Sequence, residues 1–186
     1  MSEWDKKRDV LHRYDSTAHI YDMRYAEEQT TKIKTALESI DLNKQDFVLD
    51  VGCGTGLLFD YVSSHVETIV GLDISREILL HAKKRAGKFP NVHLVLADAD
   101  KIPLKGDISD HVFALTLIQN TPNSLRTLNE IERVAKENAI IVVNGLRKKF
   151  PLKTFKGLLR DAGLDTIAFK NESLNSHVAV CKKSIH

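Results

Sequence analysis

The sequence predicts an α/β fold, a three-layer sandwich in which helices cover both faces of a mostly parallel sheet. Three observations support this fold class. Short apolar runs alternate along the chain with segments of helical spacing. The runs are continuously apolar, as in parallel strands buried on both faces. The last two runs follow each other with no room for a helix, which predicts an antiparallel strand at the C-terminal end of the sequence.

The N-terminal forty residues differ in texture from the rest of the chain. They are polar, and they carry Tyr14, Tyr21 and Tyr25 among acids and bases. Helices are predicted at 5–14 and at 27–40, where apolar residues recur at helical spacing. We therefore expect residues 1–40 to form a helical lid segment and residues 41–186 to form the main domain.

The first half of the main domain alternates strand and helix. Residues 47–51 form a β-rich run that ends in glycines, and residues 57–65 have helical spacing. A second buried strand at 68–72 stops at Asp73, and Ser75 is a candidate N-cap for a helix that continues to about residue 88. The segment 92–96 reads as the third strand.

The second half repeats the pattern and then changes it. Strands are predicted at 110–118 and 139–144, with a helix at 124–136 between them. Pro151 suits the start of a helix, and Gly163 suits its end. The final strands, 165–169 and 177–181, make the antiparallel pair. Ligands of such sheets bind at the carboxyl ends of the strands, where strand order reverses.

Composition limits the functional classes. The formal net charge of +2 gives no global field that demands nucleic acid or membrane. The two cysteines lie far apart with no CxxC spacing, and the histidines show no metal-ligand spacing, so we expect neither a metal site nor a disulfide framework. The charged start MSEWDKKRDV lacks the apolar core of a signal peptide, and the longest apolar runs are too short to cross a bilayer. A cytoplasmic protein is expected.

The stretch FVLDVGCGTG, residues 47–56, is the most informative part of the sequence. Gly52 and Gly54 permit positive φ and remove Cβ atoms, and Gly56 lets the next helix lie close to the sheet. A ligand can therefore approach bare backbone here. The spacing is G-x-G-x-G, where dinucleotide-binding turns use G-x-G-x-x-G, and Asp50 directly before the turn would repel a pyrophosphate but attract a cation.

Two further carboxylates follow the next two strands. Asp73, after the second strand, lies where a carboxylate accepts hydrogen bonds from both ribose hydroxyls. Asp98, after the third strand, can reach an adenine amino group, and Ile74 can cover the adenine face. The expected ligand is an adenosyl compound with a positive tail and no phosphates. S-adenosylmethionine fits that description.

The order and spacing of these motifs resemble class I S-adenosylmethionine-dependent methyltransferases. Members of that group read VLDVGCGTG, then GLDIS, then D-A-x-x-I/L-P, and here these are residues 48–56, 71–75 and 98–103. The resemblance covers about residues 45–145. It implies a Rossmann-like, seven-stranded sheet with six parallel strands and the last strand inserted antiparallel.

The resemblance also implies roles for individual residues. The methionine part would lie along Gly52, Cys53, Gly54 and Gly56, and its ammonium would lie near Asp50. Asp73 would hold the ribose, and Asp98 and Ala99 would flank the adenine. Leu117 would lie near the sulfonium, and Tyr14 and Tyr21 would form an aromatic lid.

The methyl acceptor is not identified by the sequence. Enzymes that methylate base or glutamine amino groups commonly carry N/D-P-P-Y/F after the fourth strand, whereas this chain has Gln119-Asn120-Thr121-Pro122-Asn123. Gln119 and Asn120 are candidates either to bind the acceptor or to cap the next helix, and no catalytic residue is assigned. Two arrangements are compatible with the sequence. In one, the lid segment closes over a small acceptor; in the other, the site stays open for a macromolecule or a partner subunit. A basic cluster at 147–160 is interpreted first as a solvated face and second as an RNA phosphate footprint.

Three functions compete on this evidence. The leading hypothesis is an S-adenosylmethionine-dependent methyltransferase acting on a small molecule, RNA or protein. A non-catalytic cofactor-binding scaffold or activating subunit is the alternative, because no acceptor-side residue is diagnostic of catalysis. A NAD-dependent oxidoreductase is disfavoured by the glycine spacing and by Asp50.

Overall fold

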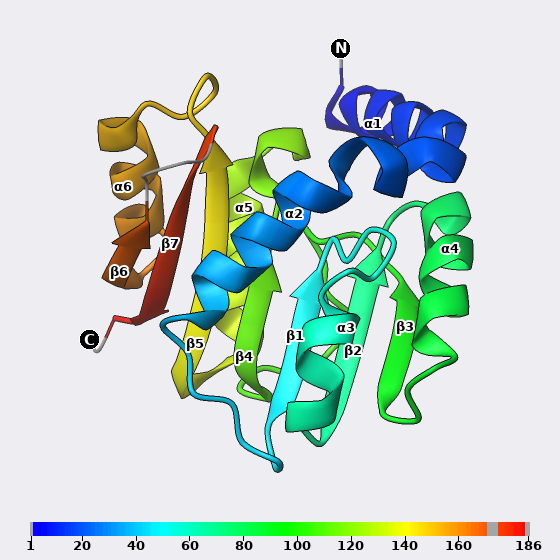
Figure 1. The fold of residues 1–186 in the computed structure, drawn as a ribbon. Helices are drawn as coiled ribbons and strands as arrows, with labels where there is room; N and C mark the ends of the chain where they lie inside the picture. The colour runs from blue at the N-terminus through cyan, green and yellow to red at the C-terminus, as the bar shows by residue number, and fades with distance from the viewer. Residues whose placement is uncertain (1, 171–174, 185–186) are drawn as a thin grey trace.

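The structure, a computed structural model, describes residues 2–170 and 175–184, without the side chains of His19 and Tyr21. Its seven-stranded sheet has the order β3-β2-β1-β4-β5-β7-β6 (Figure 1). The strands are β1 (Phe47–Val51), β2 (Thr68–Asp73), β3 (Val92–Leu96), β4 (Ser109–Ala114), β5 (Ala135–Leu146), β6 (Leu164–Lys170) and β7 (Ser176–Lys183). The five strands β3, β2, β1, β4 and β5 each pair in parallel with their neighbours in that order, and β7 is antiparallel to both β5 and β6. The predicted fold class, with its inserted antiparallel strand, is confirmed.

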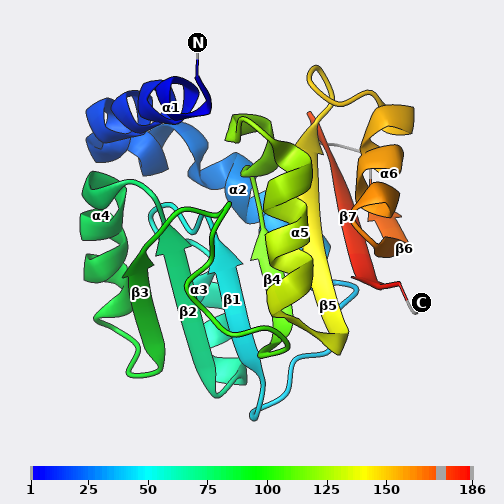
Figure 2. The ribbon, with the colours of Figure 1, turned by 180° about the vertical axis from the view of Figure 1, so that it is seen from behind.

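Helices cover the sheet on both faces. On one face lie α2 (Tyr21–Leu37), α3 (Phe59–Val62) and α4 (Arg76–Ala86), which bury apolar side chains in one cluster. On the other face, seen in Figure 2, lie α5 (Ser124–Val134) and α6 (Leu152–Asp161), which belong to a second cluster. Along β1, Val48 packs into the first cluster and Leu49 into the second, as the two-residue period of a strand requires. Among the described residues, no helix is long and apolar enough to cross a membrane.

The remaining helix, α1 (Glu3–Thr17), lies across the carboxyl ends of the strands (Figure 1). Its N-terminus is fixed by a capping box. The Ser2 hydroxyl accepts a hydrogen bond from the Asp5 amide at 3.1 Å, and the Asp5 carboxylate accepts one from the Ser2 amide at 2.9 Å. This cap explains why the helix begins before the predicted residue 5. None of its side chains is fully buried, but Tyr14 packs against the small apolar cluster of Ala18 and Ile78.

Other element boundaries also differ from the sequence-based expectation. The predicted helix at 57–65 is divided into α3 and a 3₁₀ turn, Ser63–His65. Strand β4 ends at Ala114 and not at residue 118, because the chain turns at Thr116, whose φ is +60°. Strand β5 begins at Ala135, directly after α5, and is longer than predicted. The β4 difference matters most, since it creates the acceptor side of the site.

Gly56 performs the packing role predicted for it. A Cβ at this position would lie 2.3 Å from Cε2 of Phe59, which is fully buried. The φ of Gly56 is +81°, which further restricts the position to glycine. The absent side chain lets α3 follow the turn closely and brings the glycine turn against the sheet.

Candidate functional site

The turn after β1 folds back onto the end of β2. The amides of Gly52 and Cys53 both donate to the Leu72 carbonyl, at 2.8 and 2.9 Å. Gly52 and Gly54 have φ values of +72° and +56°, a region that other residues rarely adopt. A Cβ on Gly52 would lie 2.9 Å from Cδ1 of Leu117, so a side chain there would fill the space between the turn after β1 and the segment after β4. The turn therefore presents bare backbone at the point where strand order reverses.

A cleft of about 730 Å³, open to solvent, lies over this turn. A second pocket of about 370 Å³ adjoins it and shares Gly52, Gly54 and Leu115 with it. Among the predicted cofactor residues, the cleft is lined by Tyr14, Gly52, Gly54, Asp73, Ile74, Asp98, Ala99 and Leu117, and the second pocket by Asp50 and Cys53. Gly56 lines neither, and the side chain of Tyr21 is outside the described part of the structure. The structure thus brings residues from three successive strand ends to one cleft.

Asp73 is held rigidly at the end of β2. Its two carboxylate oxygens accept hydrogen bonds from the Gly54 amide at 3.0 Å and from the Ser75 amide at 2.9 Å. Burial raises the pKa of Asp73, and these backbone donors act against that rise. Each oxygen retains a lone pair, so the carboxylate is oriented to accept two further donors from a ligand.

Asp50 is the most unusual carboxyl group in the site. It is buried with 4% of its surface exposed, and no hydrogen-bond donor contacts its carboxylate among the described residues. Burial, reinforced by the nearby Asp73, raises the pKa of Asp50 to about 8. A buried carboxylate without a partner is costly, and a cation is the group that would satisfy it. The second pocket therefore favours a cationic ligand group.

Asp98 has a partner that the sequence did not reveal. Lys7 of α1 places its Nζ 2.5 Å from Oδ2 of Asp98 and 2.7 Å from Oδ2 of Asp100. The other oxygen of Asp98 accepts the Asp100 amide at 3.0 Å. Lys7 and Asp98 are ninety-one positions apart, and no local pattern in the sequence indicates their contact. The carboxylate expected at the adenine amino group is thus also an anchor for α1.

The lid segment is attached to the site by several polar contacts. The Tyr14 hydroxyl accepts a hydrogen bond from Asn120 at 2.9 Å, and burial raises the pKa of Tyr14. Asp15 accepts the Ser75 hydroxyl at 2.5 Å. At the start of α2, Asp22 forms an ion pair with Arg85 at 2.8 Å. These contacts add to the packing of Tyr14 against buried Ala18 and Ile78.

The acceptor side of the cleft is organised around Thr116. Its φ of +60° is rare for a β-branched residue and implies backbone strain. The Thr116 amide donates to Asn144 of β5, and its carbonyl accepts Asn120 Nδ2 at 2.9 Å. Its hydroxyl donates to Gln29 at 2.9 Å and accepts from Lys32 Nζ at 3.1 Å. Every polar group of this residue is therefore fixed.

Lys32 is a buried cation in this network. It is 2% exposed, and its ammonium contacts Thr116 and Glu28, the latter at 2.7 Å. Gln29, three residues before Lys32, lines the second pocket. Sequence reasoning missed this group, because a lysine in a polar, amphipathic segment is normally expected at the surface.

The two acceptor-side candidates are separated by the structure. Asn120 lines the cleft, whereas Gln119 is buried outside it. Neither caps the next helix, because Asn123 accepts the Arg126 amide at 3.1 Å and fills that role. Asn120 joins Tyr14 of the lid to Thr116 and is therefore a structural part of the acceptor wall.

The residues present fit S-adenosylmethionine. The unpartnered carboxylate of Asp50 suits its cationic tail, and Asp73 offers oriented acceptors for ribose hydroxyls. The absent side chain of Gly52 leaves room between the strand ends. A pyrophosphate would instead meet two buried carboxylates.

The family comparison agrees with this geometry. Residues 49–143 match the family model described as "Methyltransferase domain". The chain belongs to this methyltransferase family. The match includes the strand ends that carry Asp50, Asp73 and Asp98, so the family predicted from the sequence is confirmed.

Curated relatives of this methyltransferase chain act on different acceptors. A malonyl-[acyl-carrier protein] O-methyltransferase of Marinomonas sp. is 33% identical over 142 residues, which are 75% of this chain and 52% of the relative. A demethylmenaquinone methyltransferase of Staphylococcus saprophyticus is 27% identical over 141 residues, 74% of this chain and 59% of the relative. The chain thus spans about half the length of the curated relatives it matches.

Solved structures share the fold over nearly the whole chain. A chain of the Haloferax volcanii complex that contains a methyltransferase activator superposes with a TM-score of 0.83 and 17% identity, covering 92% of this chain and 98% of that chain. Magnesium protoporphyrin IX methyltransferase of Synechocystis PCC 6803, solved with bound SAM, has a TM-score of 0.78 and 18% identity, covering 96% and 97%. These likenesses establish the fold.

Proposed function

We propose that the protein transfers a methyl group from S-adenosylmethionine to an acceptor substrate. The observation that carries this proposal is the placement of Asp73 and Asp98 in one cleft, with Asp50 in the adjoining pocket, around a side-chain-free turn. A positively charged adenosyl ligand matches that set of groups, and membership of the methyltransferase family supports the activity.

Each residue of the cofactor half has a binding task in this proposal. Asp73 accepts the ribose hydroxyls, and Asp50 ionises as it takes the cationic methionine end. Ile74 and Ala99 line the cleft on either side of the adenine position, with Asp98 at the amino group. When bound, the cofactor supplies a methyl group on an activated sulfonium leaving group.

The acceptor half contributes position more than acid–base chemistry. The cleft is lined here by Thr116, Leu117 and Asn120. Hydrogen bonds fix Thr116 and Asn120 in position. Since the leaving group is already activated, rate enhancement depends chiefly on aligning the acceptor and excluding water. The lid segment, residues 1–40, performs the exclusion in this proposal, with Tyr14 over the cleft.

Calorimetry with S-adenosylhomocysteine and with NAD tests the proposal. We expect binding of S-adenosylhomocysteine and no binding of NAD, because only the former lacks phosphates. Binding of NAD alone would overturn the assignment. Transfer of labelled methyl groups into a cell extract separates an enzyme from a scaffold: tight cofactor binding with no transfer would favour the scaffold.

We also propose that a partner subunit associates with the free edge of β3. The Haloferax neighbour was solved with an activator, and here the edge strand exposes Leu96, with Leu80 of α4 also exposed. An apolar, unpaired edge is a template for another strand. Co-purification with an activator subunit should be lost in Leu96→Asp and retained in Ile167→Asp, which changes the other edge. Equal loss in both variants would contradict this surface.

We place the protein in the cytoplasm. Both cysteines, Cys53 and Cys181, are free and buried, as in a reducing compartment. Burial raises the pKa of both thiols, which keeps them protonated and unreactive. Microscopy of a fluorescent fusion tests the placement, and a periplasmic or extracellular signal would contradict it.

A further inference from the structure

A run of basic residues occupies the loop after β5 and helix α6. From residue 139 to residue 160 the sequence contains six basic residues and no acidic one. All six are exposed: Arg147, Lys148 and Lys149 in the loop after β5, and Lys153, Lys156 and Arg160 on α6. We call these six residues the basic rim.

The basic rim adjoins the mouth of the cleft. Its loop leaves the carboxyl end of β5, at the same end of the sheet as α1 (Figure 1). Lys149 donates to the Gln119 carbonyl, and the next residue, Asn120, lines the cleft and binds Tyr14. Two consecutive residues therefore join the rim to the lid, and a ligand on the rim is within reach of the acceptor wall.

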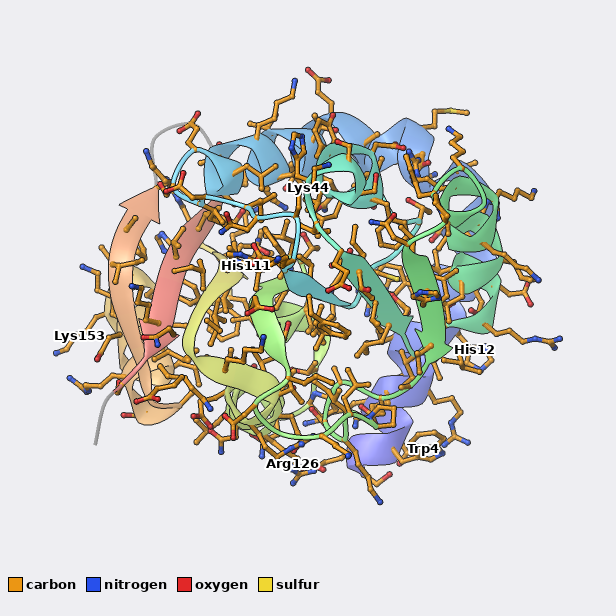
Figure 3. All side chains as sticks on the ribbon, turned by 90° about the horizontal axis from the view of Figure 1, so that it is seen from below. Trp4, His12, Lys44, His111, Arg126 and Lys153 are labelled. Carbon is orange, nitrogen blue, oxygen red and sulfur yellow. The ribbon has the colours of Figure 1, made fainter. Side chains whose placement is uncertain are left out.

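Within the described part of the chain, the four lysines of the rim form no ion pair, in contrast to basic residues elsewhere. Lys7, Arg85, Arg133 and Lys183 each pair with a carboxylate within 3.0 Å. On the rim, Arg160 has only a contact of 3.9 Å with exposed Asp161, and within the described residues Lys148 and Lys153 have no ion pair. Figure 3 shows Lys153 on the outer side of the molecule. Lys149 bonds to the Gln119 carbonyl and Lys156 lies over the Phe169 ring at 5.2 Å, so neither charge is neutralised by a described carboxylate.

The composition of the rim favours a phosphate backbone over a protein surface. Protein interfaces need a buried apolar centre, and the rim exposes one large apolar side chain, Leu152, at 39%. Phosphate backbones are bound by lysine and arginine charge without such a centre. Helix α6 is about 15 Å long, which matches roughly four nucleotides of a helical strand.

We propose that the basic rim binds the phosphate backbone of an RNA strand and so presents an acceptor nucleotide to the cleft. This inference rests on the proposed methyltransferase function, since it names the substrate class of that site. The loop residues lie nearest the acceptor wall, and α6 extends the contact away from it.

Two charge-matched triple variants test the proposal. Lys148→Glu/Lys153→Glu/Lys156→Glu reverses three charges of the rim. Lys83→Glu/Lys84→Glu/Lys88→Glu reverses three exposed lysines at the C-terminal end of α4, remote from the cleft mouth. The probe is a fluorescent single-stranded RNA of mixed sequence, followed by anisotropy at several salt concentrations.

We expect the rim variant to bind RNA at least about tenfold more weakly and to reduce the slope of log K against log salt by about 2, from three lost phosphate contacts. The α4 variant should bind like the wild type. No RNA binding by the wild type, or equal weakening in both variants, would overturn the proposal. Equal competition by polyglutamate would also overturn it, in favour of an acidic protein.

S-adenosylhomocysteine calorimetry on the same proteins keeps the two proposals distinguishable. Unchanged cofactor affinity in the rim variant shows that its fold is intact, so loss of RNA binding then supports the rim. If the glutamate variant loses cofactor affinity as well, the milder Lys→Gln triple at the same positions replaces it. Failure of the wild type to bind S-adenosylhomocysteine would contradict the methyltransferase function. The RNA measurement would still decide whether the basic rim binds a phosphate backbone.

Discussion

The two halves of the sheet place different kinds of residue at their strand ends. Asp50 and Asp73 lie in the last residues of β1 and β2, and Asp98 follows β3. Strands β4 and β5 are followed by Thr116 and by the basic loop that starts at Arg147. In the two proposals above, the same strand-end geometry serves two ligands. The aspartate half would bind a cationic adenosyl compound, and the other half would face the phosphates of an RNA strand.

The halves differ as strongly in how they satisfy their own polar groups. Asp50 is buried without a hydrogen-bond donor among the described residues, while Thr116 has each of its polar groups bonded. A buried polar group without a partner can be satisfied by a bound ligand, whereas a group that is already hydrogen-bonded contributes to the rigidity of the site. We therefore expect mutations in the first half to change binding, and mutations in the second half to change stability and alignment.

The largest expected effect follows from Asp73→Ala. It removes the paired acceptors for the ribose and releases the Gly54 and Ser75 amides. Loss of two hydrogen bonds to a charged group should weaken S-adenosylhomocysteine binding about 100-fold or more, measured by calorimetry. Asp110→Ala, at the amino end of the sheet, is the matched control and should bind normally. Unchanged affinity in Asp73→Ala would refute its role.

The next effect is the pH dependence of stability, which Asp50→Asn should reduce. Because the folded-state pKa of Asp50 is about 8 and its ordinary value is 3.8, the folded state binds the extra proton between these values. Stability of the ligand-free protein should therefore fall as pH rises from 5 to 8, by up to about 1.4 kcal/mol per pH unit, and level off above 8.

Asp73, whose pKa is also raised, contributes a slope of the same sign. Denaturant unfolding of wild type and Asp50→Asn at pH 5, 7 and 9 measures the difference. The variant should be the more stable protein at pH 8 and should bind cofactor more weakly. If the stability of the two proteins changed equally with pH, the pKa of Asp50 would not be raised in the folded state.

A smaller effect is expected on the acceptor side. Asn144→Ala leaves the Thr116 amide without its acceptor and should lower the free energy of unfolding by about 2 kcal/mol. In a Thr116→Gly background the same change should cost about 1 kcal/mol less, because glycine adopts positive φ without strain. A double-mutant cycle from urea unfolding measures this coupling, and additive costs would show that the two residues act independently.

The smallest effect on global stability is expected for Lys7→Met. This change releases α1 from Asp98 and Asp100 but disturbs no buried apolar contact of that helix. Amide exchange should accelerate within Glu3–Thr17 and nowhere else, with a change in Tm of only a few degrees. Lys6→Met, beside it and exposed, is the control. Equal exchange in both variants would mean that the lid is not held by Lys7.

Local sequence signals were sufficient for most of the fold. The strand 92–96 was predicted with its observed bounds, and Ser75 caps α4 by accepting the Ile78 amide at 3.1 Å. Both depend on short-range chemistry: a β-branched apolar run and a hydroxyl at a helix start. The glycine turn and the three aspartates were likewise readable, because strand-end positions in a parallel sheet converge whatever the details of packing.

Long-range contacts were not readable from the sequence. Nothing local marks Lys7 as the partner of Asp98, or Lys32 as a buried contact of Thr116. The positive φ at Thr116 also carried no signal, since a threonine in an apolar run predicts continued strand. The contacts that hold the lid segment and Thr116 were therefore missed, whereas the residues proposed for the cofactor could be named one by one from the sequence.

The central claim is that the buried carboxylate of Asp50 completes its charge balance with the cationic end of an adenosyl ligand. Calorimetry of S-adenosylhomocysteine binding at pH 7, in two buffers of different ionisation enthalpy, tests it directly. We predict release of about one proton per ligand from the wild type, as Asp50 ionises from a pKa of about 8, and no such release from Asp50→Asn. Binding with equal proton release in both proteins, or no binding at all, would contradict the claim.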